Sequence, residues 1–283
     1  MRFLDVKTDF AFKKVFGSEG SKNILMSFLN SVIDFPDEGK ITDLTIVDPY
    51  QIPIIRGMKD TFVDVKAVLS NGKRVIIEMQ VLNVAGFEKR ILYNAAKSYS
   101  TQISKSEEFK GLEPIIALTI TDFIMFPEIE GVISCFKLME KETLVQYSDD
   151  IELIFIELPK FKKEKVEELT DIAEKWIYFI KEAGSLEYIP ETFDKELKDA
   201  FNVANTAGLS REEEEAQFKR RDFIWLQKGS LDLALEQGMQ QGMEKGMEKG
   251  IEKGIEKGME KALSKLVESG MSEEKAKKIL GLS

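Results

Sequence analysis

The spacing of apolar residues is helical at the start of the chain and then becomes extended. Between residues 9 and 33, apolar side chains recur every three or four positions, which predicts a helix. Thr8 or Asp9 can cap its first turn, and Gly17–Gly20 is expected to break or bend it. Residues 41–55 alternate instead and are rich in β-branched side chains, which predicts a strand.

Two stronger strands follow, and a short turn joins them. Residues 61–69 and 73–82 flank the dipeptide Asn71-Gly72, a pair typical of β-hairpin turns. The remaining periodic segments are a helix at 87–104 and strands at 114–121, 131–138 and 151–157. This order of helices and strands predicts an α/β fold with a mixed central sheet flanked by helices.

Each strand of the predicted hairpin has one wholly apolar face. The apolar positions are Val63, Val65, Ala67 and Leu69 on the first strand and Val75, Ile77, Met79 and Val81 on the second. The opposite positions are Asp64, Lys66 and Val68 on the first strand and Ile76, Glu78 and Gln80 on the second. Because side chains alternate along a strand, the apolar faces are expected to enter one packed layer, and the charged residues to gather on the other side.

The apolar pattern also predicts the register of the hairpin. Val65 and Ile77 share a face only if odd positions pair with odd positions, whereas a strict two-residue loop at Asn71-Gly72 would pair odd with even. The pattern therefore demands an odd loop length or a one-residue bulge, with Gly72 in the left-handed conformation.

After Pro159 the sequence becomes rich in charge. Residues 162–183, 191–206 and 211–228 are predicted to form charged helices with apolar stripes. Glycine then recurs at every fourth position of a Glu-Lys-Gly-Met/Ile repeat, at Gly238, Gly242, Gly246, Gly250, Gly254 and Gly258. We expect four segments: an α/β core at 1–160, a helical extension at 161–235, the repeat at 236–261 as a linker or a helix, and a short terminal helical hairpin at 262–283.

The glycine repeat has two interpretations. Glycine costs about 0.8–1 kcal/mol relative to alanine at each helical position, so an isolated helix would be marginal. A spacing of four exceeds the roughly 3.6 residues of one turn, so the glycines wind around the helix, which favours a flexible or conditionally helical linker. Small residues also let helices approach closely, so the alternative is a self-associating helix that forms a homo-oligomer through the C-terminal helices.

The amino-acid composition excludes several classes of catalytic mechanism and metal site. The chain has no histidine, which excludes Ser-His-Asp and Cys-His mechanisms and histidine-ligated metals. Its one cysteine, Cys135, lies in an apolar stretch, is expected to be buried and excludes an intrachain disulfide. Carboxylates, lysines, hydroxyls and a hard cation such as Mg²⁺ remain. The predicted register puts Asp64 across from Glu78 or Gln80, so that carboxylates can converge on one cation.

The charge is uneven along the chain, although the total is −10. Residues 1–110 contain 16 Lys and Arg against 14 Asp and Glu, a net of +2, and the rest contain 24 against 36, a net of −12. The N-terminal part is thus compatible with a phosphate backbone. No run of eighteen apolar residues and no apolar leader occurs, so we expect no membrane association and a cytoplasmic location.

Five segments in order resemble a known family. They are TDFAFKKVFG (8–17), DVKA (64–67), IEMQ (77–80), KRILYNAAKSYSTQI (89–103) and ITDF (120–123). The pattern is similar to the PD-(D/E)XK nuclease core, which has a restriction-endonuclease-like α/β fold. More narrowly, it resembles the Rpn family of recombination-promoting nucleases and putative transposases. The resemblance covers about residues 1–160, and the glycine repeat is also common in that family.

The resemblance implies a metal-dependent nuclease site. Asp64 and Glu78 would hold Mg²⁺ or Mn²⁺, with Asp9 as a candidate third carboxylate. Gln80 stands where the motif usually has lysine, so we expect Lys66 to supply the missing positive charge. The alternatives are Gln80 itself or another lysine, such as Lys13 or Lys14.

The partner of such a site would be DNA. Arg90, Asn94 and Lys97 on the following helix are candidate phosphate contacts, although a solvated helical face would have the same pattern. The implied function is a Mg²⁺-dependent DNA endonuclease that promotes recombination or transposition. The alternative is an inactive nuclease fold that serves as a DNA- or protein-binding module.

Overall fold

The computed structural model describes residues 1–35, 39–51, 61–104 and 106–282. The chain forms two compact units, Met1–Ile224 and Trp225–Ser283. All of the candidate site residues lie in the first unit. Part of the strand expected at 41–55 falls on residues 52–55, which lie outside the described residues.

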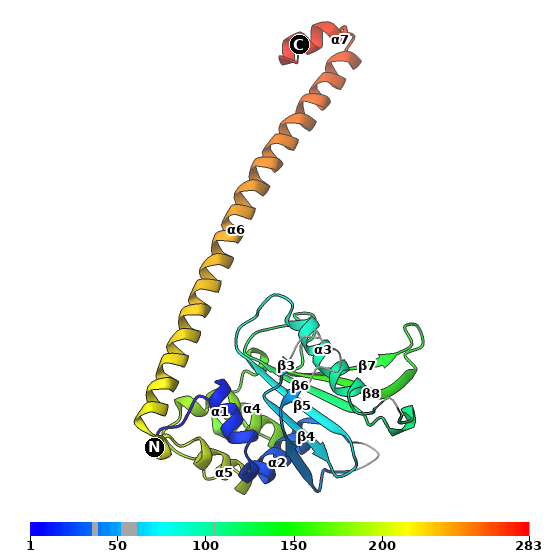
Figure 1. Ribbon diagram of the computed structural model, residues 1–283. Coiled ribbons are helices and arrows are strands. Elements are labelled where there is room, and N and C mark those ends of the chain that lie inside the picture. Colours follow the sequence, from blue (N-terminus) through cyan, green and yellow to red (C-terminus); the bar gives the residue numbers. More distant parts are fainter. Residues whose placement is uncertain (36–38, 52–60, 105, 283) are drawn as a thin grey trace. The chain divides into compact units, whose positions relative to one another are not determined.

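A six-stranded mixed sheet forms the centre of the first unit (Figure 1). Its strands, in spatial order, are β1 (Leu44–Val47), β4 (Val65–Leu69), β5 (Arg74–Gln80), β6 (Ile115–Thr121), β8 (Gln146–Glu157) and β7 (Ile133–Met139). Strands β5, β6 and β8 are parallel, and the other neighbours are antiparallel. Two short strands, β2 (Tyr50–Gln51) and β3 (Thr61–Phe62), pair separately. The predicted α/β class with a mixed sheet is confirmed.

The hairpin of β4 and β5 has the predicted register. Val65 pairs with Ile77, so odd positions pair with odd positions. The Leu69 N–H donates to the Lys73 carbonyl at 2.8 Å, and Gly72 between them has φ 89°. A three-residue loop with glycine at a positive φ therefore closes the hairpin, which is a common way to join two strands in this register.

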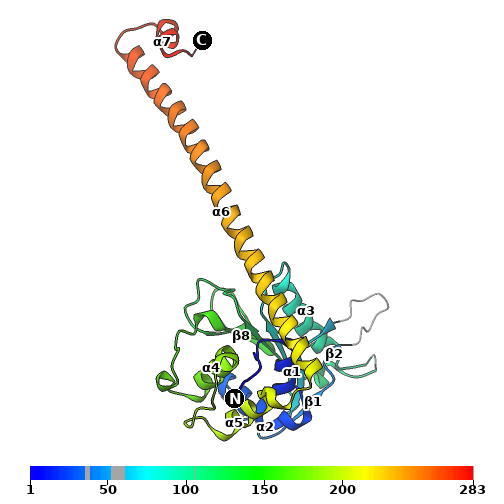
Figure 2. The same ribbon diagram turned by 90° about the vertical axis from the view of Figure 1, so that its left-hand side faces the viewer.

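Helices cover both faces of the sheet (Figures 1 and 2). One face packs against α1 (Asp9–Phe16), α2 (Lys22–Val32), α4 (Ile172–Glu182) and α5 (Lys195–Ala204). The other face packs against α3 (Phe87–Ser100). Short 3₁₀ turns lie at Glu19–Ser21, Phe109–Gly111, Leu158–Lys160, Val166–Glu168, Ala183–Ser185 and Thr206–Gly208.

The helices after residue 160 belong to the same core as the N-terminal helices. Trp176 is fully buried, and its ring centroid lies 5.9 Å from those of Phe16 and Phe28. Phe201 is buried against Phe3, with 5.0 Å between ring centroids. The expected helical extension at 161–235 thus completes the main core through α4 and α5 instead of standing apart from it.

Two expectations about single side chains are wrong. Val63 packs with Ile76 and Ala95 on the α3 side, and not with Val65 on the opposite face. The reason is that β4 begins only at Val65, so strict alternation does not extend to residues 63–64. Cys135 is exposed on the edge strand β7, where its Sγ donates to Glu152 Oε1 at 2.8 Å.

The glycine repeat is helical. Helix α6 spans Arg211–Glu268, and α7 spans Glu273–Leu280. An added Cβ at any repeat glycine would meet nothing within 4 Å in the described part of the chain, so no contact within the chain requires these glycines. None of the described helices is both long enough and apolar enough to cross a membrane.

Candidate active site

An open cleft of about 340 Å³ lies in the first unit beside the end of β5. It is lined by Lys7, Asp9 and Lys13, by Phe62 and Asp64, by Glu78, Met79, Gln80, Val81, Leu82 and Val84, by Arg90, and by Arg220, Phe223 and Ile224. Five of the residues predicted for the site therefore share one cleft: Asp9, Asp64, Glu78, Gln80 and Arg90.

Asp64 is fixed where the two hairpin strands part. Its N–H donates to the Ile77 carbonyl at 3.0 Å, and its Oδ2 accepts a hydrogen bond of 2.8 Å from the Met79 N–H. The β4–β5 pairing ends at Val65. The Asp64 carboxylate therefore accepts a hydrogen bond from a β5 amide that has no backbone partner in β4. Asp64 thereby stands next to Glu78 without belonging to a regular strand.

Lys13 links two carboxylates in the cleft. Its Nζ lies 2.7 Å from Asp9 Oδ1 and 3.5 Å from Asp64 Oδ1. Burial tends to lower the pKa of Lys13, but the hydrogen bond to Asp9 and the charge of Asp64 raise it overall. Lys13 is therefore a protonated lysine that forms ion pairs with both carboxylates.

The pKa values of Asp9 and Asp64 are shifted in opposite directions. Burial raises the pKa of Asp64 to about 7, against the opposing effects of the Met79 N–H and Lys13. Burial also tends to raise the pKa of Asp9, but its hydrogen bonds with Lys13 and Asp64 lower it overall. Below pH 7, Asp64 thus carries the proton that the pair shares, and a cation that binds there must displace it.

Glu78 is buried on β5 and held from the following helix. Its Oε1 accepts a hydrogen bond of 2.8 Å from Asn94, and its Oε2 lies 3.8 Å from Arg90 Nη2. Oε2 accepts no hydrogen bond from the described residues. Burial raises the pKa of Glu78, although Arg90 and Asn94 act in the opposite direction. A buried carboxylate oxygen with no hydrogen bond fits a cation ligand.

Gln80 uses both ends of its amide to hold its neighbours. Its Nε2 donates to the Leu82 carbonyl at 2.7 Å, and its Oε1 accepts from Arg90 Nη2 at 2.7 Å. Arg90 also stacks over the Phe87 ring, 5.0 Å from its centroid. The neutral Gln80 therefore positions a guanidinium beside Glu78.

Two lysines predicted for the site lie elsewhere. Lys66 does not line the cleft, and burial together with the charge of Arg74 lowers its pKa. Asp64 lies outside β4 and turns toward Met79, so spacing along the strand does not bring Lys66 to it. Lys97 is 2% exposed on the sheet-facing side of α3, where it donates to Thr61 Oγ1 at 3.4 Å, so it does not present its charge at the surface.

The cleft also contains residues that the sequence analysis did not assign to it. Lys13, which the sequence analysis named only as an alternative to Lys66, lies in the TDFAFKKVFG segment. Phe62 precedes Asp64 by two residues. Arg220 and Phe223 come from the first turns of α6, and no local pattern connects them with residues 9–90.

The residues present fit a divalent cation bound by few protein ligands. Within the described ranges, no three Asp, Glu or Cys side chains gather as a metal cluster. Mg²⁺ is commonly held by one or two carboxylates and completes its shell with water and substrate phosphate. Asp64 and Glu78, with one Glu78 oxygen lacking a hydrogen bond, meet that requirement.

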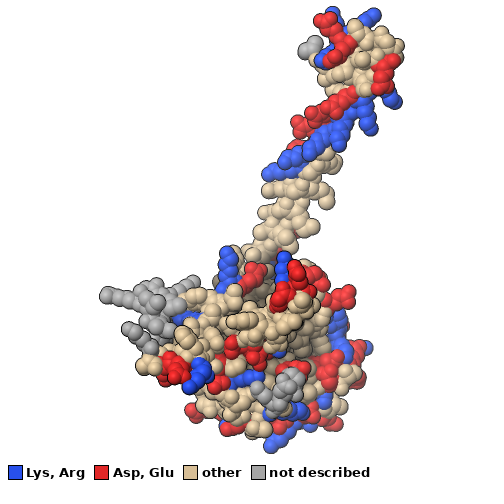
Figure 3. Space-filling view, turned by 90° about the vertical axis from the view of Figure 1, so that its right-hand side faces the viewer, with Lys and Arg blue, Asp and Glu red and all other residues tan. Residues whose placement is uncertain are grey.

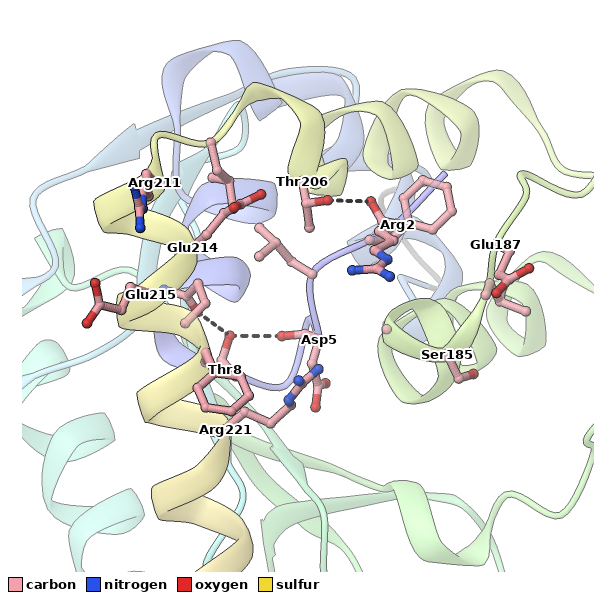
Figure 4. Close-up of a pocket in the computed structure, with 17 residues that line it drawn as sticks. Arg2, Asp5, Thr8, Ser185, Glu187, Thr206, Arg211, Glu214, Glu215 and Arg221 are labelled. Atoms are coloured by element: carbon pink, nitrogen blue, oxygen red, sulfur yellow. Dashed lines mark hydrogen bonds between the residues drawn. The ribbon is translucent and has the colours of Figure 1, made fainter.

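A larger cavity of about 760 Å³ has a different character (Figure 4). It lies between the N-terminal segment and the start of α6, where the Thr8 hydroxyl bonds to the Asp5 carbonyl at 2.8 Å and to Gln217 at 3.3 Å. Its charged lining mixes both signs: Arg2, Arg211 and Arg221 with Asp5, Glu187, Glu214 and Glu215. It lacks the cleft's pairing of a buried carboxylate, Glu78, with the partly buried Asp64, so the cleft is the better candidate for chemistry.

No large patch of one charge sign lies on the face that is visible in Figure 3. Acidic and basic side chains are interspersed over the first unit there, and they stand side by side along the Glu-Lys repeat. This face therefore offers no broad basic patch to an anionic substrate.

The hairpin whose strands part at Asp64 and the mixed sheet between two helical layers are consistent with a nuclease-like α/β fold of the PD-(D/E)XK type. A family model described as PD-(D/E)XK nuclease family transposase matches residues 6–234, and the chain belongs to this family. The match extends past residue 160, so α4, α5 and the start of α6 are part of the family's domain. No curated protein and no solved structure matches the chain.

Proposed function

We propose that the protein is a divalent-metal-dependent DNA endonuclease that promotes recombination or the transposition of mobile elements. The observation that carries this proposal is the meeting of the buried Glu78 and the partly buried Asp64 carboxylates with Lys13 and Arg90 in one cleft. Membership of a nuclease and transposase family supports DNA as the partner.

The carboxylates would hold the metal. Asp64 and Glu78 would bind Mg²⁺ or Mn²⁺, and Asn94 orients Glu78 through its other oxygen. Asp9 remains a candidate third ligand, and it already holds Lys13 in place. A cation held there would polarise the scissile phosphate and lower the pKa of an attacking water.

Two side chains would supply the positive charge that lysine usually gives at the position of Gln80. Gln80 orients Arg90 toward Glu78, and Lys13 stands 3.5 Å from Asp64 on the α1 side. Both can offset negative charge that develops on the phosphate during cleavage. Lys66 is outside the cleft, so Lys13 and Arg90 replace it in this role.

The test is cleavage of supercoiled plasmid by the purified full chain with Mg²⁺, Mn²⁺ or EDTA. We expect nicked and linear products only with metal, and a loss of at least about 100-fold in Asp64→Asn and Glu78→Gln. Asp43→Asn is the matched control, because Asp43 pairs with Lys22 outside the cleft. A folded wild-type protein that binds plasmid but never cuts it would support the alternative, an inactive binding module, which the neutral Gln80 favours.

A further inference from the structure

Two phenyl rings stand exposed in the cleft beside its charged groups. Phe62 of β3 is 66% exposed and Phe223 of α6 is 50% exposed, and both line the cleft. Val84 adds a third exposed apolar side chain at 43%. Large apolar side chains left exposed in a concave charged site indicate a ligand with apolar faces of its own.

Phe62 is supported from behind. Its ring lies 4.7 Å from that of Tyr50, at 31° between planes, and the two residues pair across β2 and β3. Phe62 also precedes Asp64 by two residues, which is about 7 Å along an extended chain. A ligand that stacks on this ring would therefore have its backbone close to the proposed metal carboxylates.

Arg220 gives the cleft a cation that is free to meet a phosphate. Three other cations of the cleft have partners: Lys7 donates to the Lys181 carbonyl, Lys13 pairs with Asp9, and Arg90 donates to Gln80. Arg220 is exposed, and within the described parts of the chain it makes no hydrogen bond or ion pair, although its charge helps to lower the pKa of Asp9. Its position beside Asp9 suits a phosphate that enters the site.

We infer that the cleft takes an unpaired segment of DNA, with bases stacked on Phe62 and Phe223 and a phosphate held by Arg220. This inference rests on the proposed nuclease function and names its substrate class. Base faces are flat and apolar, and they reach a protein ring only where the strand is unpaired, because a duplex hides them between neighbouring base pairs. A site that read only the outside of a duplex would need cations without exposed rings.

The test is equilibrium binding by the full chain in EDTA, where no cleavage occurs. Fluorescence anisotropy would compare a labelled single-stranded 12-mer with the same sequence as a duplex. We expect the single strand to bind at least about 10-fold more tightly. Phe62→Ala and Phe223→Ala should each weaken single-strand binding by about 5- to 150-fold. The control is Phe218→Ala, an exposed ring on the same helix that lies outside the cleft.

Salt titration tests the phosphate contact separately. Arg220→Gln should lower the slope of log affinity against log salt by about 0.7 for a single strand. Arg221→Gln is the control, since Arg221 lines the other cavity. Thermal unfolding of each variant would confirm that the fold is kept, and all of the substituted side chains are exposed.

The outcomes separate this inference from the proposed function. Equal affinity for duplex and single strand, or unchanged binding by the Phe62 and Phe223 variants, would overturn the inference even if plasmid is cut. Tight single-strand binding through the two rings, without metal-dependent cleavage, would overturn the nuclease proposal and leave the strand-binding cleft in place.

Discussion

The backbone amide of Met79 donates a hydrogen bond of 2.8 Å to the carboxylate of Asp64. This contact marks the point at which β4 leaves β5, and it holds Asp64 beside Glu78 in the cleft. It uses one carboxylate oxygen and leaves the other facing Lys13 at 3.5 Å. The same bond thus fixes the position of the proposed metal ligand and its electrostatic surroundings.

Lys13, and not Lys66, should be the lysine on which cleavage depends. Lys13→Gln removes a cation from the cleft, and we expect the rate of plasmid nicking to fall by about 100-fold with the fold retained. Lys66→Gln should leave the rate within about threefold of wild type, because Lys66 does not line the cleft. The reverse result, with Lys66→Gln inactive and Lys13→Gln active, would contradict the site as assembled from these residues.

The contribution of Asp64 to the stability of the metal-free protein should fall as the pH rises from about 4 to about 7. The pKa of Asp64 is about 7 in the folded state and about 3.9 in an unfolded chain. Over this window the folded state binds more protons, so Asp64 contributes stability that is complete below about pH 4 and lost as the pH rises through 7. In thermal unfolding, the Tm of Asp64→Asn should therefore rise relative to the Tm of wild type between pH 4 and pH 8.

A control and a metal titration complete this prediction. Lys22 lowers the pKa of Asp43, so the Asp43→Asn variant should lose stability relative to wild type as the pH rises through the acidic range, opposite in sign to Asp64→Asn. Mg²⁺ should stabilise wild type more at pH 8 than at pH 5.5, because at pH 5.5 it must displace the proton of Asp64. A Tm gap between Asp64→Asn and wild type that does not change with pH would show that Asp64 does not titrate as stated.

Asn94 should act as a positioning residue for Glu78. Asn94→Ala removes the hydrogen bond of 2.8 Å to Oε1, and we expect apparent Mg²⁺ affinity to fall by about 10- to 100-fold. The readouts are the Mg²⁺ dependence of nicking and the Mg²⁺-induced rise in Tm, and excess Mg²⁺ should recover much of the rate. Gln102→Ala, which removes only two exposed hydrogen bonds to the Glu113 backbone, should leave both unchanged. Asn94→Ala with wild-type Mg²⁺ dependence would show that Glu78 needs no such support.

The chain should tolerate loss of the repeat but not of the start of α6. Truncation after Lys228 keeps Arg220 and Phe223 in the cleft, and we expect metal-dependent nicking within about threefold of the full chain. Truncation after Ser210 removes both and should reduce DNA binding strongly. If the repeat helices self-associate, size-exclusion chromatography should show a smaller assembly for the 1–228 protein than for the full chain. Loss of DNA binding by the folded 1–228 protein would instead make residues 229–283 a DNA-binding arm.

Much of the framework follows from local pattern. Alternation along 61–82 predicted the pairing of Val65 with Ile77 and the left-handed Gly72, because parity along a strand decides which face a side chain occupies. The break at Gly17–Gly20 separates α1 from α2 as expected. The neighbouring Asp64 and Glu78 follow from the same register, so the proposed metal pair could be identified from the sequence.

The rest depends on contacts between segments distant in the chain. Alternation failed at Val63 because the strand stops there, and this turned Asp64 away from Lys66. Lys13 reaches Asp64 only because α1 packs on the sheet, and Arg220 enters the cleft from a helix more than a hundred residues further along. Sequence periodicity records which side of an element is buried. Which distant side chains meet there is decided by the packing of α1, α3 and α6 around the end of β5, and no local spacing encodes that packing.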